Sequence, residues 1–461
     1  MTVLPLPLTP YETLYWRDDN ERYPMNFIMP CHVAGVVDRA ALLTALRRVL
    51  PRHPLLTARI DGTARPPCWV PADGEPDVLW VDGAGAAGPL MWHRLEIERR
   101  SGLRVIVEQA GERACIYFQF QHACCDGLAA LAFMGEVFIA YHLVFEPGDP
   151  EVGLRELDVE RLRTRGAPPP APPTPHVRKS WRQLYNEVRR VVRFVSYRGR
   201  PIAIPAACKP SAAPFAEGIL VSQRIDAEAL QQLRSQASEV GATVNDLLVF
   251  HAFRALSAWN LRHQPGRRKQ RFRMAIPTSL RGPGDKALPA AVSLSYAIMD
   301  RSTDHCHDLA SMLAGIRDES REILRERIPA QFWFCLAVAV RFRRILDFVL
   351  RTTPCLASIV VSNISDPVRR FTSRVAQRDG QVVAGNLVIE DMSGAPPVRS
   401  GTRMSICISL FGGGATIAAM FDPHVLTRAA AADFLRTYVE LLSAAGCPGE
   451  PSGLPSASQR A

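Results

Sequence analysis

The chain has 461 residues, 47% of them hydrophobic, and a formal net charge of +10. It is too long for one ordinary domain, so we expect a large core divided between two lobes. The basic balance suits nucleic acid, an anionic membrane surface or an acidic ligand. An odd count of 11 cysteines without paired spacing, and a start that lacks a signal-peptide pattern, argue against a secreted, disulfide-bonded protein and for the cytoplasm.

No apolar run reaches the roughly 20 residues that a membrane span needs. The longest candidate, residues 332–340, is followed by Arg341, Arg343 and Arg344. We therefore expect no transmembrane helix.

The first lobe is predicted over residues 1–165. Residues 40–50 have a helical pattern, and residues 57–60 have the pattern of a strand. Residues 115–120 alternate, which predicts a strand with one apolar face, and residues 128–141 predict an apolar helix.

The turn between that strand and that helix has the sequence Gln121-His122-Ala123-Cys124-Cys125-Asp126-Gly127. A histidine at the end of a buried strand can be held rigidly and still reach a cavity, as a general base must. The local pattern alone favours structural roles: a satisfied histidine, an N-cap at Asp126 and a tight turn at Gly127.

Residues 166–217 are predicted to link the lobes. Proline-rich residues 166–175 cannot continue a helix or a sheet. Residues 178–198 form a basic amphipathic segment that either packs on the protein, which is slightly favoured, or docks on an anionic membrane surface. It lacks a nucleic-acid motif and aromatic residues placed for base stacking, so no nucleic-acid partner is expected.

The second lobe is predicted over residues 218–445, with a flexible tail at 446–461. Strands are expected at 219–225 and 356–361, with a turn at 362–367, and helices at 227–238, 243–259 and 429–442. Two strands in 403–421 surround Gly412-Gly413-Gly414. We interpret this run as a hairpin turn, because no helix follows it as a phosphate loop requires.

Two further sequence patterns bear on metal binding and hydrolase activity. Asp304-His305-Cys306-His307-Asp308 has the side chains of a metal site, but ligands so close in one short loop rarely complete a tetrahedron. Capping of the next helix is favoured, and we predict no metal. No Gly-x-Ser-x-Gly turn is present, which argues against an α/β-hydrolase.

The segment from Gln121 to Gly127 resembles the HHxxxDG motif of the condensation-domain superfamily. This superfamily includes peptide-synthetase condensation domains, polyketide-associated acyltransferases and wax ester synthase/diacylglycerol acyltransferases, with chloramphenicol acetyltransferase a more distant relative. His122 matches the second histidine, and Gln121 replaces the first. Weaker matches are RHPLLTARI, ATVNDLL, the strand end IPTSLR at Arg281, and VVSNISDP, which is similar to VVSNVPGP of wax ester synthases.

The resemblance implies an α/β fold of two lobes, chloramphenicol acetyltransferase-like, with mixed sheets flanked by helices and a tunnel between the lobes. It implies an acyltransferase that moves an acyl group from acyl-CoA or from the phosphopantetheine of an acyl carrier protein to a hydroxyl or amine, with O-acyl transfer favoured. A neutral His122 would act as general base, without a covalent intermediate or a bound cofactor.

The resemblance also implies roles around His122. Asp126 and Gly127 would be structural, with Arg281 from the second lobe as the ion-pair partner of Asp126. Ser362 or Asn363 would donate to the oxyanion, although a strand-end Ser-Asn pair is commonly a turn. Cys124 and Cys125 fall on variable positions and are interpreted as packing residues rather than nucleophiles. The alternative function, a non-catalytic binding or scaffold protein, stays open because of Gln121, and the sequence names neither the acyl chain nor the acceptor.

Overall fold

The structure is a computed structural model that describes residues 3–168, 189, 199–209, 218–266, 269–342, 346–348, 350, 355–366 and 375–444. Apart from Arg189, the basic segment predicted at residues 178–198 lies outside the described residues, as does the predicted tail.

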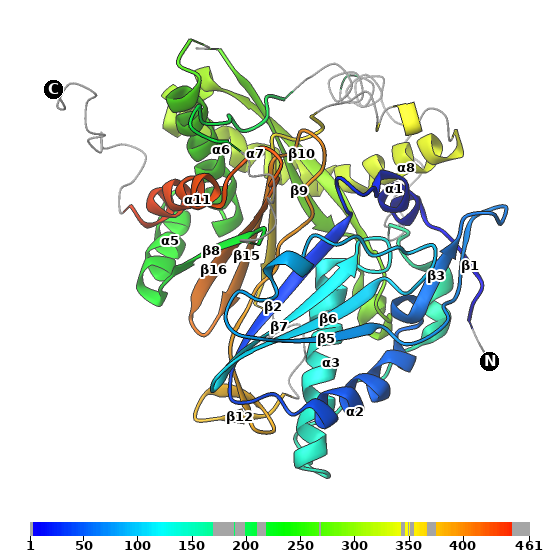
Figure 1. Ribbon diagram of the computed structural model, residues 1–461. Coiled ribbons are helices and arrows are strands. Elements are labelled where there is room, and N and C mark those ends of the chain that lie inside the picture. The colour runs from blue at the N-terminus through cyan, green and yellow to red at the C-terminus, as the bar shows by residue number, and fades with distance from the viewer. Residues whose placement is uncertain are drawn as a thin grey trace.

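The first sheet has seven strands in the order β12-β13-β14-β2-β7-β6-β5 (Figure 1). β5 is parallel to β6 and the other pairs are antiparallel, so the sheet is mixed. Helices α2 (Arg39–Val49) and α3 (Gly127–Phe145) share a core with one face of this sheet. The strands are β2 (Asn26–Ala34), β5 (Asp77–Asp82), β6 (Leu103–Ala110), β7 (Arg113–Gln121), β12 (Gln377–Arg378), β13 (Gln381–Ala384) and β14 (Leu387–Met392).

The second sheet has six strands in the order β10-β9-β11-β15-β16-β8. β11 lies between β9 and β15 and is parallel to both, while the remaining pairs are antiparallel. One face shares a core with α5 (Ala227–Glu239), α6 (Val244–His263), α7 (Leu309–Arg325) and α11 (Arg428–Ser443). The strands are β8 (Leu220–Ile225), β9 (Arg271–Ser279), β10 (Leu294–Ser302), β11 (Ile359–Ser365), β15 (Met404–Phe411) and β16 (Gly414–Phe421).

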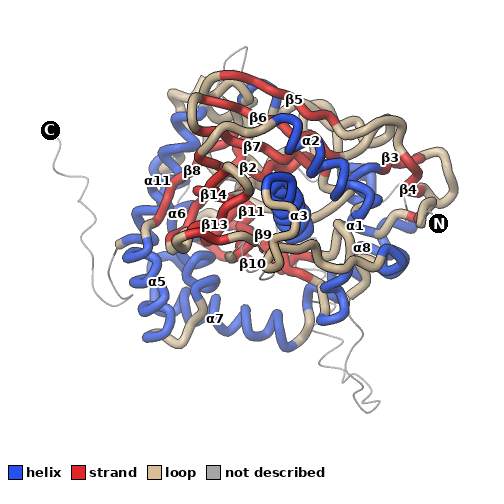
Figure 2. The backbone as a smooth tube through the Cα atoms, turned by 90° about the horizontal axis from the view of Figure 1, so that it is seen from below, coloured by secondary structure: helices blue, strands red, loops and turns tan. Residues whose placement is uncertain are grey.

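Two mixed sheets flanked by helices confirm the α/β architecture expected from the sequence. Two further helices lie beside each other at the edge of the molecule: α1 (Pro10–Asp18) and α8 (Ile328–Arg341) (Figures 1 and 2). A small third sheet joins β1 (Leu6–Pro7), β4 (Cys68–Pro71) and β3 (Ala58–Asp61).

The two halves of the chain are interlocked. Strands β12 to β14 come from the second half, yet β14 pairs with β2 in the first sheet, with Val388 opposite Ala34. The predicted boundary near residue 218 separates two halves of the sequence, but the first sheet takes strands from both halves. The sequence pattern predicts strands but does not say which sheet a strand joins.

Helix α3 is apolar on all sides because it is enclosed. By length and composition it could cross a membrane, and 72% of its most apolar window is buried inside the protein. Figure 2 looks along this helix, with strands of the first sheet on one side and β9 and β10 on the other. This burial accounts for the apolar surface of α3 without a lipid environment.

Several local predictions are confirmed. Thr243 and Asp246 form a capping box at the start of α6, and Gly412 and Gly413, both with positive φ, form the turn between β15 and β16. Asp308 caps α7, as expected for its segment. One prediction is wrong: Ser362 and Asn363 lie within β11, which runs to Ser365, because they pair with Cys407 and Ile408 of β15.

A buried ionic network fixes α3 against both halves of the chain. Glu136 of α3 accepts hydrogen bonds from Arg52 at 2.8 Å and Arg155 at 2.9 Å, and its other neighbour is Nε2 of His53 at 3.3 Å. Nδ1 of His53 accepts from the backbone N–H of Ala290, so Nε2 carries the proton and faces the carboxylate. Burial alone would raise the pKa of Glu136, but these partners lower it to about 2.

We predict that Glu136→Gln lowers the free energy of unfolding at pH 7 by on the order of 3 kcal/mol, since it leaves the partly buried Arg52 and Arg155 without their buried anion. The lowered pKa means that the carboxylate stabilises the fold fully above its unfolded value of 4.5 and loses this effect as the pH falls toward 2. Urea unfolding at pH 7 and pH 3 should show the two proteins converging at low pH. Glu160→Gln, at an exposed ion pair with Arg163, is the control and should change little.

Candidate active site

His122 lies one residue beyond the end of β7. Its backbone N–H donates to the carbonyl oxygen of Met25 at 2.7 Å, which continues the pairing of β7 with β2. Because side chains alternate along a strand, His122 faces the same side as Phe118 and Phe120, toward α3. The side chain is thus held where the strand ends and the helix begins, as the sequence predicts.

Aromatic rings enclose the imidazole. The ring of Tyr15 in α1 stacks on that of His122 with centroids 4.1 Å apart and an interplanar angle of 11°, and Phe27 lies tilted at 4.9 Å. About 7% of the residue stays exposed, and its Nδ1 is buried.

Burial lowers the pKa of His122 below its ordinary value of 6.5. The backbone carbonyls of His122 and Cys125 and the carboxylate of Asp126 oppose this effect without cancelling it. The imidazole is consequently neutral near pH 7, which is the form in which it can accept a proton.

Asp126 uses its carboxylate to hold three parts of the chain together. Oδ1 accepts from the backbone N–H of Ala129 at 3.0 Å and so caps α3. Oδ2 accepts from the backbone N–H of Ser293 at 2.7 Å and from Nη1 of Arg281 at 2.8 Å. The predicted ion pair is present, and Arg281 also donates to the carbonyl of Ala291.

Gln121 points away from His122. It is opposite Asn26 in the β7–β2 pairing, and its Oε1 accepts from the backbone N–H of Ala123 at 2.6 Å. Since adjacent residues of a strand face opposite sides of the sheet, its amide lies on the other face from the imidazole. Gln121 therefore braces the turn from the face opposite His122.

A pair of tyrosines joins the two halves of the chain next to the imidazole. The hydroxyls of Tyr15 and of Tyr296 in β10 lie 2.9 Å apart. Burial raises the pKa of both phenols, so both keep their protons. One hydrogen bond between two hydroxyls uses one proton, which leaves the second able to donate.

Of the two oxyanion candidates, Ser362 is the better placed. β11 ends against α3: a Cβ added to Gly127 would lie 3.7 Å from Cγ2 of Ile364. Val361 belongs to the core of the second sheet, so the alternation of β11 puts Ser362 on the opposite side, beside Cys407 of the first core, whose thiol takes a hydrogen bond from the Ser362 hydroxyl. Oδ1 of Asn363 accepts from the backbone N–H of Ser365, and among the described residues neither candidate bonds to His122.

The neighbouring cysteines are poor nucleophiles. Burial, and next the adjacent Cys124, raises the pKa of Cys125 well above its usual range. Sγ of Cys124 donates to the carbonyl oxygens of Gln121 and Gly102. Both side chains are fully buried, which fits packing rather than attack on a substrate.

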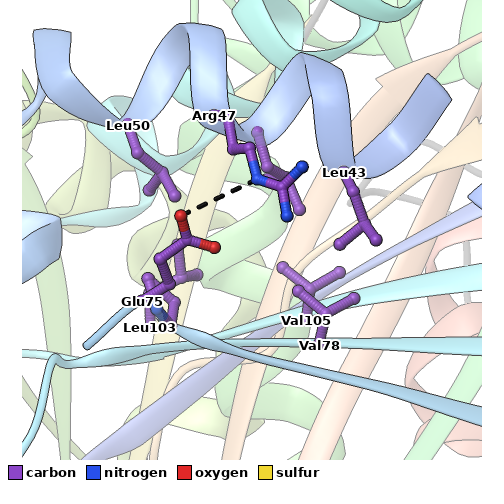
Figure 3. A pocket seen from close by; sticks show the side chains of 9 residues that line it. Leu43, Arg47, Leu50, Glu75, Val78, Leu103 and Val105 are labelled. Atoms are coloured by element: carbon purple, nitrogen blue, oxygen red, sulfur yellow. Dashed lines mark ion pairs between the residues drawn. The ribbon is translucent and has the colours of Figure 1, made fainter. Parts of the chain in front are cut away.

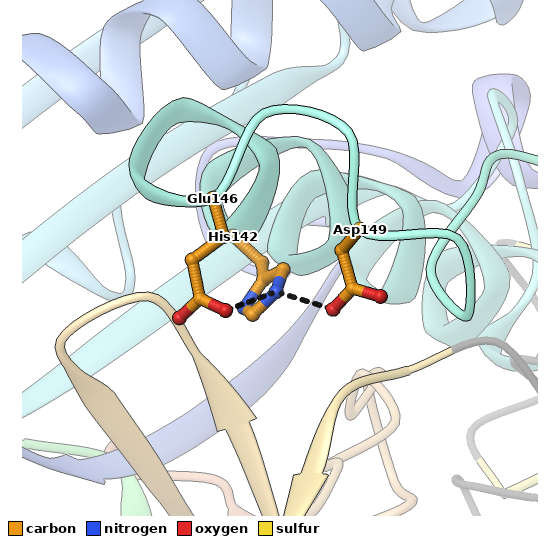
Figure 4. A group of neighbouring side chains, drawn as sticks. All are labelled: His142, Glu146 and Asp149. Atoms are coloured by element: carbon orange, nitrogen blue, oxygen red, sulfur yellow. Dashed lines mark hydrogen bonds and ion pairs between the residues drawn. The ribbon is translucent and has the colours of Figure 1, made fainter.

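Two other groups of residues were considered as sites. His142, Glu146 and Asp149 cluster at the end of α3 (Figure 4), but Nδ1 of His142 accepts from the backbone N–H of Gly385. Nε2 then carries the proton and donates to Asp149 at 3.2 Å, so it has no lone pair for a metal. A shallow pocket between α2 and β5 (Figure 3) is crossed by the Arg47–Glu75 ion pair and is otherwise apolar.

The sequence analysis missed Tyr15, Phe27, Tyr296 and Ser293. A capping box, Thr9 with Glu12, starts α1 and could have placed Tyr15 on a helix. The stacking on His122 arises only when α1 packs against the end of β7. Pattern alone carries no signal for that contact.

Comparisons with known proteins place the fold. The trichothecene 15-O-acetyltransferase TRI3 from Fusarium sporotrichioides has a TM-score of 0.69 at 12% identity, covering 95% of this chain and 94% of that chain. The first condensation domain of the calcium-dependent antibiotic synthetase has a TM-score of 0.64 at 15% identity, and the match covers 97% of this chain and 98% of that chain. The starter condensation domain of rhizomide synthetase, in complex with C8-CoA and Leu-SNAC, has a TM-score of 0.62 at 13% identity, and the match covers 97% of this chain and 95% of that chain.

The chain has the condensation-domain fold. No family model matches the sequence, and no curated protein matches it. At this identity the likeness establishes the architecture alone, so the roles of residues within the condensation-domain fold must be argued from their own geometry.

We predict that Asp126 and Arg281 are strongly coupled. Asp126→Ala should lower the free energy of unfolding by on the order of 3–5 kcal/mol, because the partly buried Arg281 and the backbone N–H groups of Ala129 and Ser293 all lose their acceptor. Arg281→Ala should cost less, since the carboxylate keeps two backbone donors. A double-mutant cycle by urea unfolding should give a coupling of about 1–3 kcal/mol. Strictly additive losses would show that the pair does not act as a unit.

We also predict that Tyr15→Leu raises the pKa of His122 toward 6.5, since loss of the stacked ring admits water to the imidazole. Imidazole NMR titration measures this directly, without a substrate. Tyr15→Phe keeps the ring and loses the hydroxyl, so it should leave the pKa near the wild-type value. An unchanged pKa in Tyr15→Leu would mean that Tyr15 does not shield the ring.

Proposed function

We propose that the protein is an acyltransferase, which moves an acyl group from a CoA or carrier-protein thioester to a hydroxyl or amine, with His122 as general base. The observation that carries this proposal is the neutral imidazole at the end of β7, enclosed by Tyr15 and Phe27 with its Nδ1 buried, and we take Nε2 as the nitrogen that meets the acceptor. The condensation-domain fold of the chain supports it.

The proposed reaction begins when Nε2 of His122 takes the proton of the acceptor O–H or N–H. The acceptor atom attacks the thioester carbonyl, and the carbon–sulfur bond breaks as the tetrahedral intermediate collapses. The departing thiolate then takes the proton back from the imidazolium. Protons balance, no covalent enzyme intermediate forms, and the step needs no bound cofactor because the thioester brings its own leaving group.

The developing oxyanion needs a donor, and two are available. One is the Ser362 hydroxyl, which bonds to the Cys407 thiol, and the other is the second proton of the Tyr15–Tyr296 pair, whose Tyr15 ring stacks on the imidazole. A well-placed donor of this kind contributes about 10²–10³-fold to the rate. Asn363 is the weaker candidate, because its Oδ1 is engaged with its own turn.

Donor and acceptor classes follow from chemistry and from the neighbours. The rhizomide synthetase domain was solved with C8-CoA and Leu-SNAC, and TRI3 is named as an O-acetyltransferase. Both support a thioester donor, with an acyl carrier protein as the alternative source of the thioester, and O-acyl transfer, as in TRI3, is the reaction that we propose for this chain. We expect this activity in the cytoplasm or at the surface of a membrane.

The second candidate function is a non-catalytic binding or scaffold protein. It was suggested by Gln121 in place of a histidine. The position of Gln121 on the opposite face of the sheet weakens this suggestion, since its side chain supports the turn and leaves the surroundings of His122 intact.

We predict that His122→Ala lowers kcat for acyl transfer by about 10²–10⁴-fold, the usual contribution of a general base. Mass spectrometry of products, after incubation with a panel of acyl-CoAs and a cell lipid extract, identifies a substrate pair on which to measure it. Cys125→Ala is the matched control from the same turn and should stay active. Wild-type turnover in His122→Ala would overturn the mechanism, and no acyl product from any pair would favour the scaffold function.

A further inference from the structure

The outer face of α8 is apolar. Phe334 is 59% exposed, Val338 is 62% exposed and Phe342, at the C-cap, is 56% exposed. These residues are four apart, so they form one stripe along the helix. Exposed helix faces of globular proteins normally carry polar side chains, and large contiguous apolar patches mark interaction sites.

The inner face of α8 is anchored. Pro329 and Leu336 are buried, and the carbonyl of Pro329 accepts a hydrogen bond from Ser295 of β10. Phe332 and Trp333 pack against the core of the first sheet. The apolar stripe is therefore the outward side of a fixed helix, in the part of the chain that the structure describes.

The charges beside the stripe are basic. Arg341 is exposed on α8, and the sequence continues as Phe342-Arg343-Arg344. Two acidic side chains of this region are paired, Glu326 with Arg325 and Asp347 with Arg17. An apolar stripe that ends at the exposed Arg341 is complementary to a surface with an apolar interior and anionic headgroups.

We propose that the outer face of α8 docks on an anionic phospholipid bilayer. Phe334, Val338 and Phe342 enter the interface, and Arg341 meets the headgroup phosphates. The stripe is one helix wide, which is narrow for a stable interface between two copies of the chain, since such interfaces bury about 800 Å² per partner. Two copies of this chain, each with a net charge of +10, would repel each other, whereas anionic headgroups attract it.

Docking in this way would bring the candidate active site to the membrane. α8 lies beside α1 (Figures 1 and 2), and α1 carries the Tyr15 ring that stacks on His122. An apolar acceptor in the bilayer would then be close to the imidazole. The docking itself does not depend on the proposed chemistry.

The test is flotation of the full-length protein with vesicles of phosphatidylcholine, with and without 30% phosphatidylglycerol (a ~30% anionic content mimics a charged leaflet). Wild type should float with the anionic vesicles at low salt and less at high salt. Phe334→Ser with Val338→Ser should weaken binding by about tenfold or more, and Arg341→Glu by about fivefold or more. Val144→Ser, at an exposed apolar residue on the distant end of α3, is the matched control and should bind as wild type.

Three outcomes would overturn the proposal. One is wild type that stays in the soluble fraction with anionic vesicles at low salt. Another is flotation that survives the α8 changes but is lost in Arg189→Glu with Arg190→Glu, which would assign docking to the segment at 178–198. The third is a lipid-free dimer, seen by light scattering, that the α8 double variant dissolves. Imidazole NMR of His122 in each variant verifies that the fold near the site is unchanged.

Discussion

The site depends on the three hydrogen bonds that the carboxylate of Asp126 accepts. The carboxylate caps α3 at Ala129, receives the backbone of Ser293 and pairs with Arg281, so the turn that carries His122, the start of the core helix and the second lobe meet at two oxygen atoms. Among the described residues, no hydrogen bond joins this carboxylate to the imidazole, so its effect on His122 is electrostatic. His122 is positioned instead by strand pairing and by ring stacking.

Burial and chemistry are linked at His122. Enclosure by Tyr15 and Phe27 lowers the pKa of the imidazole and so keeps it neutral, while the hydroxyl of Tyr15 is fixed by Tyr296 from the other half of the chain. A movement between the halves would alter the tyrosine pair and the shielding of the ring together. The interlocking of β14 with the first sheet opposes such movement.

Local patterns predicted most helices and strands, and they predicted the position of His122 at a strand end. The Asp126–Arg281 pair came from resemblance, since 155 residues separate its partners. What the sequence could not give are contacts decided by packing: Tyr15 on His122, His53 against Glu136, and β14 in the first sheet. Each depends on which elements become neighbours, and a pattern with a period of 2 or 3.6 residues describes one element at a time.

Gln121 illustrates how structure changes the meaning of a sequence difference. In the motif it occupies the place of a histidine, which suggests lost chemistry. In the strand it faces the opposite side from His122, and its Oε1 accepts the N–H of Ala123, so its requirement is a side-chain acceptor that can brace the turn. Residues that are adjacent in a sequence motif can face opposite sides of a sheet. Gln121 thus supports the turn from one face of the sheet, while the proposed base faces the side of Phe118 and Phe120.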